Sequence, residues 1–373
     1  MPLIDEATLA IPEGAALEAV FWKGRTDFLP VVRKMARDTW RVADPMPAIR
    51  LLQAANRPLW TMPHRVEAPE QRRLRDGFLE VLAAANAPLL LHSPHEPVDG
   101  LARDGHLVRL MWHGSVKATG RWNYAQAALP HMLTFDRLGY AGWSSLAGVE
   151  RREVLAIEQP VADAFHAAHT EPFLAEGQSK YRQDASIPVE EEGFVFLPLQ
   201  LPNDSVIALK HFDAPYAEGI RRMVGSLAGE GVPLVLKRHP HCTDPAIGKL
   251  LDGLVAAWPG RVSVSRASVH ALIRRARAVL TVNSGVGFEA LLHGKPVVAA
   301  GKAEYRVAAT ELTDPDAAPA ALATAEAAHD PAFVRRYLFL ALNQYQIDTR
   351  SPVSFQRAAL RVLCQDYIER VPR

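Results

Sequence analysis

The stretch LTVNSGVGFEALLHGKPVV, from Leu280 to Val298, decides the fold. A short apolar segment ends at the polar corner 283–285, and a helical pattern follows at once. That pattern ends at His-Gly, directly before a second apolar segment. A strand, a tight polar turn, a helix and another strand in succession are typical of a parallel sheet covered by helices.

The same alternation continues on both sides of this stretch. Upstream of it, the apolar periodicity predicts strands over 193–200, 232–240 and 261–265 and helices over 215–231, 244–260 and 268–279. The first half of the chain is less regular, with a helix expected over 69–88 and strands over 106–115 and 131–140. A long amphipathic helix is expected over 351–371.

These patterns predict an α/β protein of two Rossmann-like domains with a C-terminal helix that closes the chain. A length of 373 residues suits two domains. We expect an N-terminal α/β domain over 1–190, a C-terminal Rossmann-like domain over 191–330, and a helical segment over 331–373 that packs back across both.

Composition excludes several classes of function. The 42 Lys and Arg residues balance 41 Asp and Glu residues, which argues against a general nucleic-acid binder. Two cysteines are too few for a disulfide framework and favour a reducing compartment. The N-terminus has no secretory pattern, and no apolar run has the length of a membrane span. We therefore expect a cytoplasmic protein, with peripheral contact to the inner membrane left open.

Polar clusters follow three of the expected strands, at the edge where open α/β sheets bind ligands. The corner Asn283-Ser284-Gly285 opens a helix, whose free N–H groups and partial positive charge attract phosphate. Glu289, one turn further along, is placed to accept hydrogen bonds from ribose hydroxyls. On the alternative interpretation Asn283 and Ser284 only cap the helix and Glu289 is a solvated first-turn acid.

The other two clusters are KRHP (237–240) and LPNDS (201–205). Lys237 and His239 are donors suited to phosphate, and Pro240 fixes the turn; a strand that simply ends in charged residues is the alternative. A metal site built with Cys242 lacks the paired spacing of structural zinc sites. Asp204 is a carboxylate beside the same strand ends, and an Asx turn is its alternative role.

Taken in order, the segments FVFLPLQLPNDSVI, LKRHP and TVNSGVGFEALLHGKPVVAAGKAEY resemble the retaining β-Kdo transferases of bacterial capsule and O-antigen synthesis, the capsule polysaccharide synthesis family. The His-Pro pair is more distantly similar to bacterial sialyltransferases. The resemblance covers about 194–305 specifically and the first hundred residues weakly, with TFDRLGYAGWSSLA between them.

This resemblance implies a GT-B-like fold and CMP-β-Kdo as donor, bound without a metal or other cofactor. It assigns the donor site to Lys237, His239, Pro240, Asn283, Ser284, Gly285, Glu289 and Tyr305. The relatives tend to have a second Ser or Thr where this chain has Gly285, which leaves more of the phosphate binding to backbone N–H groups.

Retention of configuration by double displacement needs a carboxylate nucleophile, and the resemblance places it at Asp204. His239 would stabilise the leaving phosphate. Asp136 is a candidate base, with a turn aspartate as the alternative. The expected partner is a glycan or glycolipid acceptor, for which the N-terminal half and its border offer His113, Lys117, Arg121 and Trp143. Of Trp112 and Trp122, we expect at least one in the core.

Three other functions remain open from the sequence. One is an inverting CMP-sugar transferase, similar to the sialyltransferases. Another is a UDP-sugar transferase or epimerase of the same architecture. The third belongs to a different class: a non-catalytic glycan- or nucleotide-binding subunit of a polysaccharide export assembly, in which Asp204 is only a turn residue.

Overall fold

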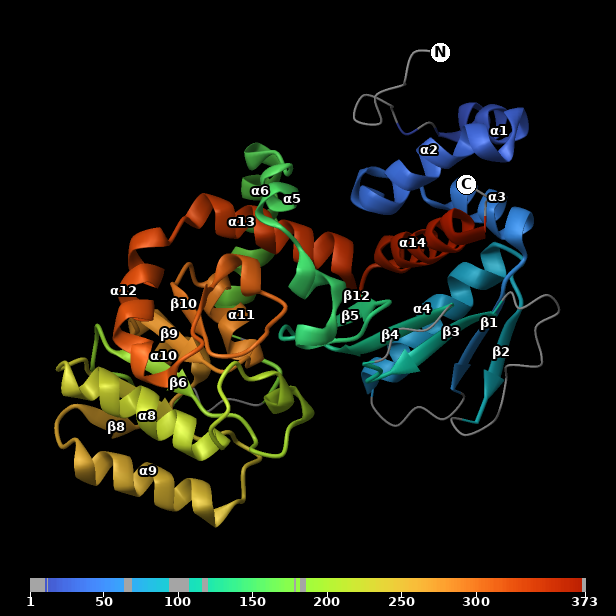
Figure 1. Cartoon of the computed structure of the whole chain (residues 1–373). Helices are drawn as coiled ribbons and strands as arrows, with labels where there is room; N and C mark the ends of the chain where they lie inside the picture. The colour runs from blue at the N-terminus through green and yellow to red at the C-terminus, as the bar shows by residue number, and fades with distance from the viewer. Residues whose placement is uncertain are drawn as a thin grey trace. The chain divides into compact units, whose positions relative to one another are not determined.

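A computed structural model of the chain describes residues 11, 13–63, 69–93, 107–115, 120–177, 179–181 and 186–370. The chain forms two compact units, each with its own sheet. The first comprises residues 1–126, 131–140 and 341–373, and the second comprises 127–130 and 141–340. Figure 1 labels their helices and strands.

The first unit has a six-stranded sheet in the order β12-β5-β4-β3-β1-β2. β5 runs antiparallel to both of its neighbours, and the other pairs are parallel. Its elements are α1 (Gly14–Lys23), α2 (Arg25–Arg37), η1 (Thr39–Arg41), α3 (Met46–Asn56), β1 (Leu59–Pro63), α4 (Pro69–Ala84), β2 (Leu89–His92), β3 (Leu107–Trp112), β4 (Arg121–Gln126), β5 (Met132–Asp136), the π-helical turn η9 (Ala341–Tyr345), β12 (Gln346–Asp348) and α14 (Pro352–Arg370).

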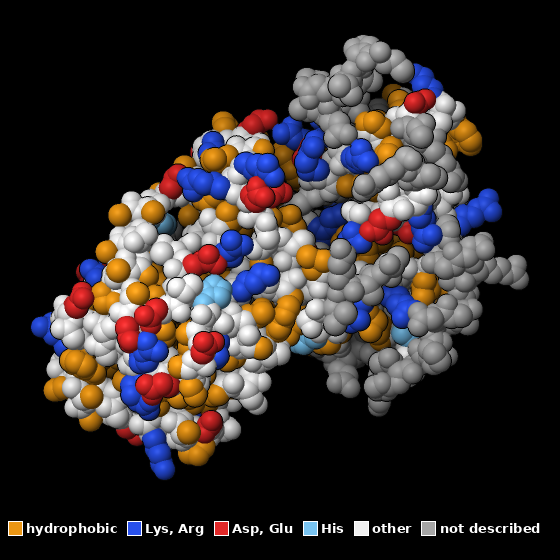
Figure 2. All heavy atoms as spheres, viewed as in Figure 1, with side chains coloured by type: hydrophobic (Ala, Val, Ile, Leu, Met, Phe, Trp, Pro, Cys, Tyr) orange, Lys and Arg blue, Asp and Glu red, His pale blue; other side chains and the backbone are white. Residues whose placement is uncertain are grey.

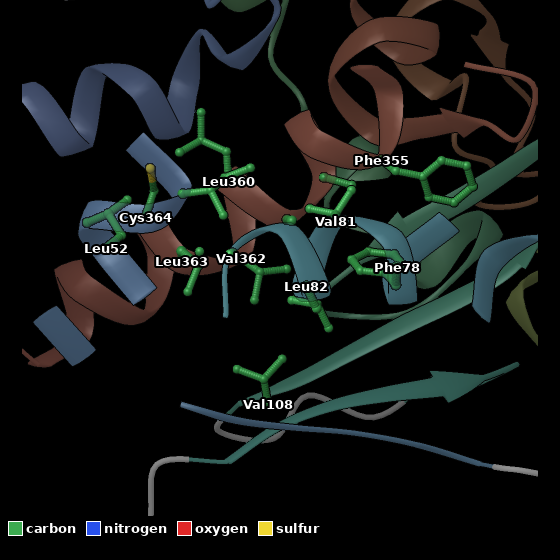
Figure 3. Close-up of a cluster of buried hydrophobic side chains, with 14 of the residues drawn as sticks. Leu52, Phe78, Val81, Leu82, Val108, Phe355, Leu360, Val362, Leu363 and Cys364 are labelled. Carbon is green, nitrogen blue, oxygen red and sulfur yellow. The ribbon is translucent and has the colours of Figure 1, made fainter. Parts of the chain in front are cut away.

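The core of the first unit joins segments from both ends of the chain. Phe78, Val81 and Leu82 of α4 repeat at helical spacing and face the same cluster as Phe355 and Leu360 of α14 (Figure 3). Trp122 also lies in this core and stacks on Phe135 with ring centroids 5.0 Å apart, which confirms the expectation for the two tryptophans.

The second unit has a parallel six-stranded sheet in the order β11-β10-β9-β6-β7-β8. Its strands are β6 (Val195–Pro198), β7 (Leu234–Lys237), β8 (Val262–Val264), β9 (Ala278–Thr281), β10 (Val297–Ala299) and β11 (Thr310–Glu311). Numbered within the unit, this is the 3-2-1-4-5-6 order of dinucleotide-binding folds. The order reverses between β6 and β9, the two strands at the centre of the sheet.

Helices cover both faces of this sheet. The helices of the second unit, not all of which lie on the sheet, are α5 (Arg151–Leu155), α6 (Gln159–Phe165), the π-helical turn η5 (His166–Thr170), α7 (Glu171–Glu176), α8 (Tyr216–Gly229), α9 (Pro245–Ala257), α10 (Val269–Arg275), α11 (Gly285–Leu292), α12 (Ala318–Ala328) and α13 (Pro331–Leu340). Short 3₁₀ turns are η3 (Ala141–Trp143), η4 (Ser145–Gly148), η6 (Ser205–Leu209), η7 (Arg306–Ala308) and η8 (Pro315–Ala317).

The side chains that cover the sheet follow from the apolar spacing of each helix. α8, α9 and α12 bury Ile220, Leu250 and Leu322 in one cluster with β6, β7 and β9. Right-handed crossovers place α11 on the opposite face from α8 and α9. The β-strands and helices predicted between 193 and 301 are therefore all confirmed, as is the α/β, GT-B-like fold class.

The division into units differs from the one expected from sequence. Residues 141–190 lie in the second unit, because α6 packs on α13: Phe165 meets the ring of Phe339 edge-on at 5.3 Å, and Asp163 pairs with Arg335 at 2.5 Å. Residues 341–373 lie in the first unit, where β12 pairs with β5 and α14 packs against α2, α3 and α4. The segment expected to act as one piece over 331–373 is thus split after Leu340.

Two surface properties follow from the described residues. On the visible face of the second unit, acidic and basic side chains are interspersed without a large patch of one sign (Figure 2). Among the helices that the structure describes, none has both the length and the apolar character needed to span a bilayer.

Candidate active site

The loops that follow β6 and β9 are tied together at the point where the strand order reverses. The side-chain amide of Gln200 donates to Asn283 Oδ1 at 2.9 Å, and Gln200 Oε1 accepts the Asn283 backbone N–H at 3.1 Å. Asn283 Nδ2 donates in turn to the Val206 carbonyl at 2.7 Å. The amide group predicted to bind the donor is therefore buried and holds the two loops in register.

Asp204 lies in the loop after β6, as the sequence indicated. Its Oδ1 accepts the Val206 N–H at 3.2 Å and begins the turn η6, which is the capping role named as the alternative. The Asp204 carboxylate also lies within electrostatic range of His239 and Tyr181, because it raises the pKa of both side chains. Asp204 and His239 therefore lie within electrostatic range of each other after the neighbouring strands β6 and β7, and their roles in a site stay predictions.

His239 follows β7 and has a fixed hydrogen-bonding partner. Its Nδ1 accepts the backbone N–H of His241 at 3.2 Å, which leaves Nε2 as the protonated donor of the neutral ring. Burial, followed by the nearby His241, lowers the pKa of His239 below its ordinary value, and Asp204 opposes that shift. A neutral imidazole with an N–H available at Nε2 suits hydrogen bonding to an anion.

Lys237 and Pro240 flank this histidine. Lys237 Nζ donates to the carbonyls of Ala267 at 2.7 Å and Arg266 at 3.1 Å, so its charge is held at the end of β8. Lys237, His239 and Pro240 all line a pocket of about 480 Å³. The remaining lining residues are Arg238, Cys242, Gly248, Leu251, Asp252, Val264, Ser265 and Arg266. Asp204 and Ser284 do not line this pocket.

Ser284 caps the N-terminus of α11, in the loop that follows β9. Its Oγ accepts the Val286 N–H at 3.2 Å, and its carbonyl accepts the Tyr305 hydroxyl at 2.7 Å. Tyr305 is buried, and burial raises the pKa of its hydroxyl well above the ordinary range. Tyr305 thus holds the backbone of Ser284 in place through this hydrogen bond.

The two glycines near this corner differ in their surroundings. A Cβ at Gly287 would lie 2.3 Å from the Tyr305 ring, so the absence of a side chain at Gly287 makes room for the tyrosine and not for a ligand. At Gly285 a Cβ would lie 3.3 Å from the Ala128 side chain. The first turn of α11 therefore packs closely against protein on the Gly287 side.

Glu289 is buried, and not solvated as the capping alternative required. Its Oε1 accepts the Ser179 hydroxyl at 2.7 Å, and its Oε2 has no hydrogen-bond partner among the described residues. Burial raises the pKa of Glu289 to about 7, while Ser179 and Lys180 oppose the shift. The hydrogen-bond partner of Glu289 in the structure is therefore Ser179, whereas the sequence predicted a ribose hydroxyl.

The residues expected to meet the acceptor belong to different parts of the fold. In the first unit, His113 follows β3, and its ring stacks on Trp112 at 4.4 Å and on Tyr140 at 5.1 Å. Arg121 Nε donates to Asn123 Oδ1 at 3.0 Å. Trp143 lies half-buried in η3 of the second unit, and Lys117 is outside the described residues.

Asp136, the candidate base, is buried at the end of β5 in the first unit. Its Oδ1 accepts the N–H groups of Leu138 at 2.7 Å and Gly139 at 3.4 Å, which is the turn role named as the alternative. The buried Arg361 guanidinium lies within electrostatic range, and Asp136 acts to raise its pKa against the larger, lowering effect of burial.

Two residues of this site were missed from the sequence. Gln200 is a buried amide that follows an apolar strand, and that unusual position was a usable signal. Tyr181 lies in the segment 151–192, where the sequence pattern is weak, yet its ring meets His239 edge-on at 5.1 Å and His241 at 5.0 Å.

Comparison with known proteins finds a family match over part of the chain. Residues 176–350 match the family model for capsule polysaccharide biosynthesis proteins. Over 121 residues the chain is 34% identical to protein FixF of Sinorhizobium fredii (strain NBRC 101917 / NGR234), a match that covers 31% of this chain and 28% of FixF. The chain therefore spans less than a third of the length of that relative.

Two solved structures share the fold of the chain more completely. They are the β-Kdo 2,7 transferase and the β-Kdo 2,4 transferase of Thermosulfurimonas dismutans KpsC. The first is 18% identical, with a TM-score of 0.50, over 78% of this chain and 92% of that one. The second is 16% identical, with a TM-score of 0.50, over 80% of this chain and 94% of that one. Residues 176–350 of the chain are thus similar to capsule polysaccharide biosynthesis proteins, and the chain shares its fold with the two KpsC transferase structures.

Proposed function

We propose that this chain is a retaining glycosyltransferase that moves Kdo from CMP-β-Kdo to a hydroxyl of a bacterial surface-glycan acceptor. The observation that carries the proposal is that Asp204 and His239 follow the neighbouring strands β6 and β7 of a Rossmann-like unit, within electrostatic range of each other. The capsule-family match over 176–350 and the fold shared with the KpsC β-Kdo transferases support it.

The leaving group in this reaction is the phosphate of CMP. His239 Nε2–H donates to it, and the start of α11 adds a partial positive charge, although Ser284 already accepts the N–H groups of Val286 and Gly287 there. The Ser284 hydroxyl keeps its own proton to donate, because its oxygen only accepts from Val286. The nucleoside then extends into the 480 Å³ pocket that Lys237 and His239 line, whose volume is within the range of small-molecule sites.

Asp204 is the nucleophile in this proposal. Its carboxylate oxygen forms a bond to the anomeric carbon of Kdo as the bond from that carbon to the CMP phosphate oxygen breaks, so that CMP leaves with the electron pair. The acceptor oxygen then forms its bond to the same carbon, the bond to Asp204 breaks, and the acceptor proton passes to a base. Two inversions give retention.

The first unit supplies the acceptor site in this proposal. Asp136 is the candidate base, and the stacked rings of Trp112, His113 and Tyr140 offer flat apolar faces for sugar rings. A cytoplasmic location, peripheral contact with the inner membrane and independence from metals remain predictions. Full activity in the presence of EDTA would be the expected result for the last of these.

Ligand-dependent thermal unfolding tests the donor class. CMP at ~100 times its dissociation constant stabilises the folded protein by about 2.7 kcal/mol, which raises the melting temperature by a few degrees. We expect this shift with CMP and a much smaller one with UMP. A larger shift with UMP would favour a UDP-sugar enzyme, and equal shifts, or no shift with either nucleotide, would overturn the proposed CMP site.

Asp204 variants separate the catalytic proposal from its rivals. Asp204→Asn keeps an oxygen that accepts the Val206 N–H, so we expect it to fold normally, bind CMP and lose transfer of Kdo by at least ~10³-fold. A non-catalytic binding subunit would be unaffected by Asp204→Asn or Asp204→Ala. An inverting transferase would give a product of the opposite anomeric configuration.

A further inference from the structure

Tyr181 bridges two histidines that follow β7, although it comes from a distant part of the chain. Its ring centroid lies 5.1 Å from that of His239 and 5.0 Å from that of His241, in edge-on arrangements of 78° and 72°. The two imidazoles lie 5.8 Å apart. Edge-to-face aromatic pairs of this kind are directional, so the tyrosine restricts how each imidazole can turn.

The short segment that carries Tyr181 is fixed by a buried contact. Ser179, two residues earlier, donates to Glu289 Oε1 at 2.7 Å, and Glu289 lies in the middle of α11. Lys180 Nζ lies 5.6 Å from the Tyr181 ring centroid. The segment 179–181 thus connects α11, whose N-terminus follows β9, to the histidine that follows β7.

One hydrogen bond defines the tautomer of His239, because the His241 N–H donates to its Nδ1 at 3.2 Å. That single hydrogen bond does not by itself fix the orientation of the imidazole, and the Tyr181 ring packs against it. Three charged groups shift the pKa of His239: His241 and Lys180 lower it, and Asp204 raises it and so favours the protonated ring. Burial, to which the Tyr181 ring contributes, keeps His239 in the neutral form.

We propose that Tyr181 is a positioning residue, whose ring holds the His239 imidazole so that its Nε2–H meets the leaving phosphate as one fixed donor. This inference rests on the proposed function for the catalytic consequence, but the contact between the two rings is independent of it. Because misplacement of a reacting group by about 1 Å can lower a rate about 100-fold, loss of the ring should lower kcat more than it raises KM.

The experiment compares Tyr181→Phe, Tyr181→Leu and Tyr181→Ala. Phe is the conservative rescue, because it keeps the ring and removes only the hydroxyl. We expect kcat for Kdo transfer to fall about 10- to 100-fold in the Ala and Leu variants, with at most a few-fold change in Phe. Leu keeps apolar volume, so it remains informative if Ala lowers the melting temperature.

NMR titration of the His239 ring protons supplies a readout that does not need activity. Loss of the Tyr181 ring exposes His239, so its pKa should rise toward the ordinary value in the Ala variant and stay unchanged in Phe. An unchanged His239 titration in the Ala variant would overturn the proposal, as would equal loss of kcat in the Phe variant. If no variant and no wild-type protein transfers Kdo, the titration still decides the positioning role while the proposed function fails.

Discussion

Gln200 and Asn283 exchange two hydrogen bonds, one at 2.9 Å between their side chains and one at 3.1 Å from the Asn283 backbone. They lie at the carboxyl ends of β6 and β9, the strands between which the sheet order reverses. Ligands bind at this position in open α/β sheets. Here the buried side chains of Gln200 and Asn283 connect the loop after β6 to the loop after β9. The geometry of the site is therefore set by residues that need not touch the substrate.

Asn283→Ala should destabilise the fold through this connection. The substitution leaves the Gln200 Nε2 amide and the Val206 carbonyl without their buried partner, and each such group costs about 1–3 kcal/mol. We expect urea denaturation to show a loss of about 2–4 kcal/mol in the free energy of unfolding. Asn203→Ala, exposed in the loop after β6, is the control and should change it by less than about 0.5 kcal/mol. Equal losses would contradict the connecting role.

Glu289 should make stability depend on pH above its ordinary titration range. Burial raises its pKa from 4.5 to about 7 in the folded protein, so the neutral form is favoured there. The stability that this group contributes is fully present below pH 4.5 and is lost as pH rises through about 7. Glu289→Gln removes this titration. As the pH rises from 4.5 through about 7, the free energy of unfolding of the variant should therefore increase by about 3 kcal/mol relative to that of the wild type.

Denaturation at pH 5 and pH 8 measures that difference. The exposed Glu230→Gln is the matched control and should shift the free energy of unfolding equally at both pH values. A difference between wild type and Glu289→Gln that is the same at pH 5 and pH 8 would mean that Glu289 titrates normally in the fold.

The contact between the buried His270 and the partly buried His293 should make the protein less stable on acidification, the opposite direction to Glu289. His270 Nδ1 and His293 Nε2 lie 2.8 Å apart, and burial, followed by His270, Arg274 and Lys295, lowers the pKa of His293 to about 3. The stability contributed by neutral His293 is present above pH 6.5 and is lost progressively as pH falls toward 3. Between pH 6.5 and 5 the loss should be about 2 kcal/mol.

His293→Gln should flatten this part of the pH profile, as measured by urea denaturation at several pH values. His169→Gln replaces an exposed histidine of the same unit and should retain the wild-type slope. Parallel slopes for wild type and His293→Gln would show that the pair is protonated without cost.

Two glycines of α9 offer a matched test of the pocket. Gly248 lines it, and a Cβ there would meet Arg238 Nη1 at 3.6 Å, whereas a Cβ at Gly253 would have nothing within 4 Å. Either Gly→Leu change should favour the helix by up to about 1 kcal/mol. We expect Gly248→Leu to weaken CMP binding at least about tenfold in calorimetry, because its side chain occupies space assigned to the nucleoside.

Gly253→Leu, on the same helix, should bind CMP as wild type does. If both variants bind CMP normally, the nucleoside lies elsewhere and only the phosphate contacts of the proposal survive. If both lose binding, the effect comes from the helix and not from the pocket.

The sequence was most informative where local pattern and final position coincide. Every element between β6 and β10 follows from apolar periodicity and turn residues, because a parallel sheet buries its strands and covers them with amphipathic helices. The placing of Asp204 and His239 at neighbouring strand ends follows from the same regularity.

The features that could not be predicted from the sequence depend on contacts between distant segments. Nothing local to Tyr181 indicates that it reaches His239, or that Ser179 would satisfy Glu289. The assignment of 141–190 to the second unit likewise depends on the packing of α6 against α13. Lys237 and Asn283 carry the residue types of a ligand site, yet backbone carbonyls and Gln200 are the partners that they have in the structure.

The most direct test of double displacement at Asp204 is the mass of the protein after incubation with CMP-Kdo in the absence of acceptor. Double displacement predicts an adduct of one Kdo unit, which peptide mass spectrometry maps to the segment that contains Asp204. The adduct should be absent from Asp204→Ala and should disappear when acceptor is added. Release of CMP and formation of the glycosidic product with no adduct at any time, and with Asp204→Ala still active, would contradict it.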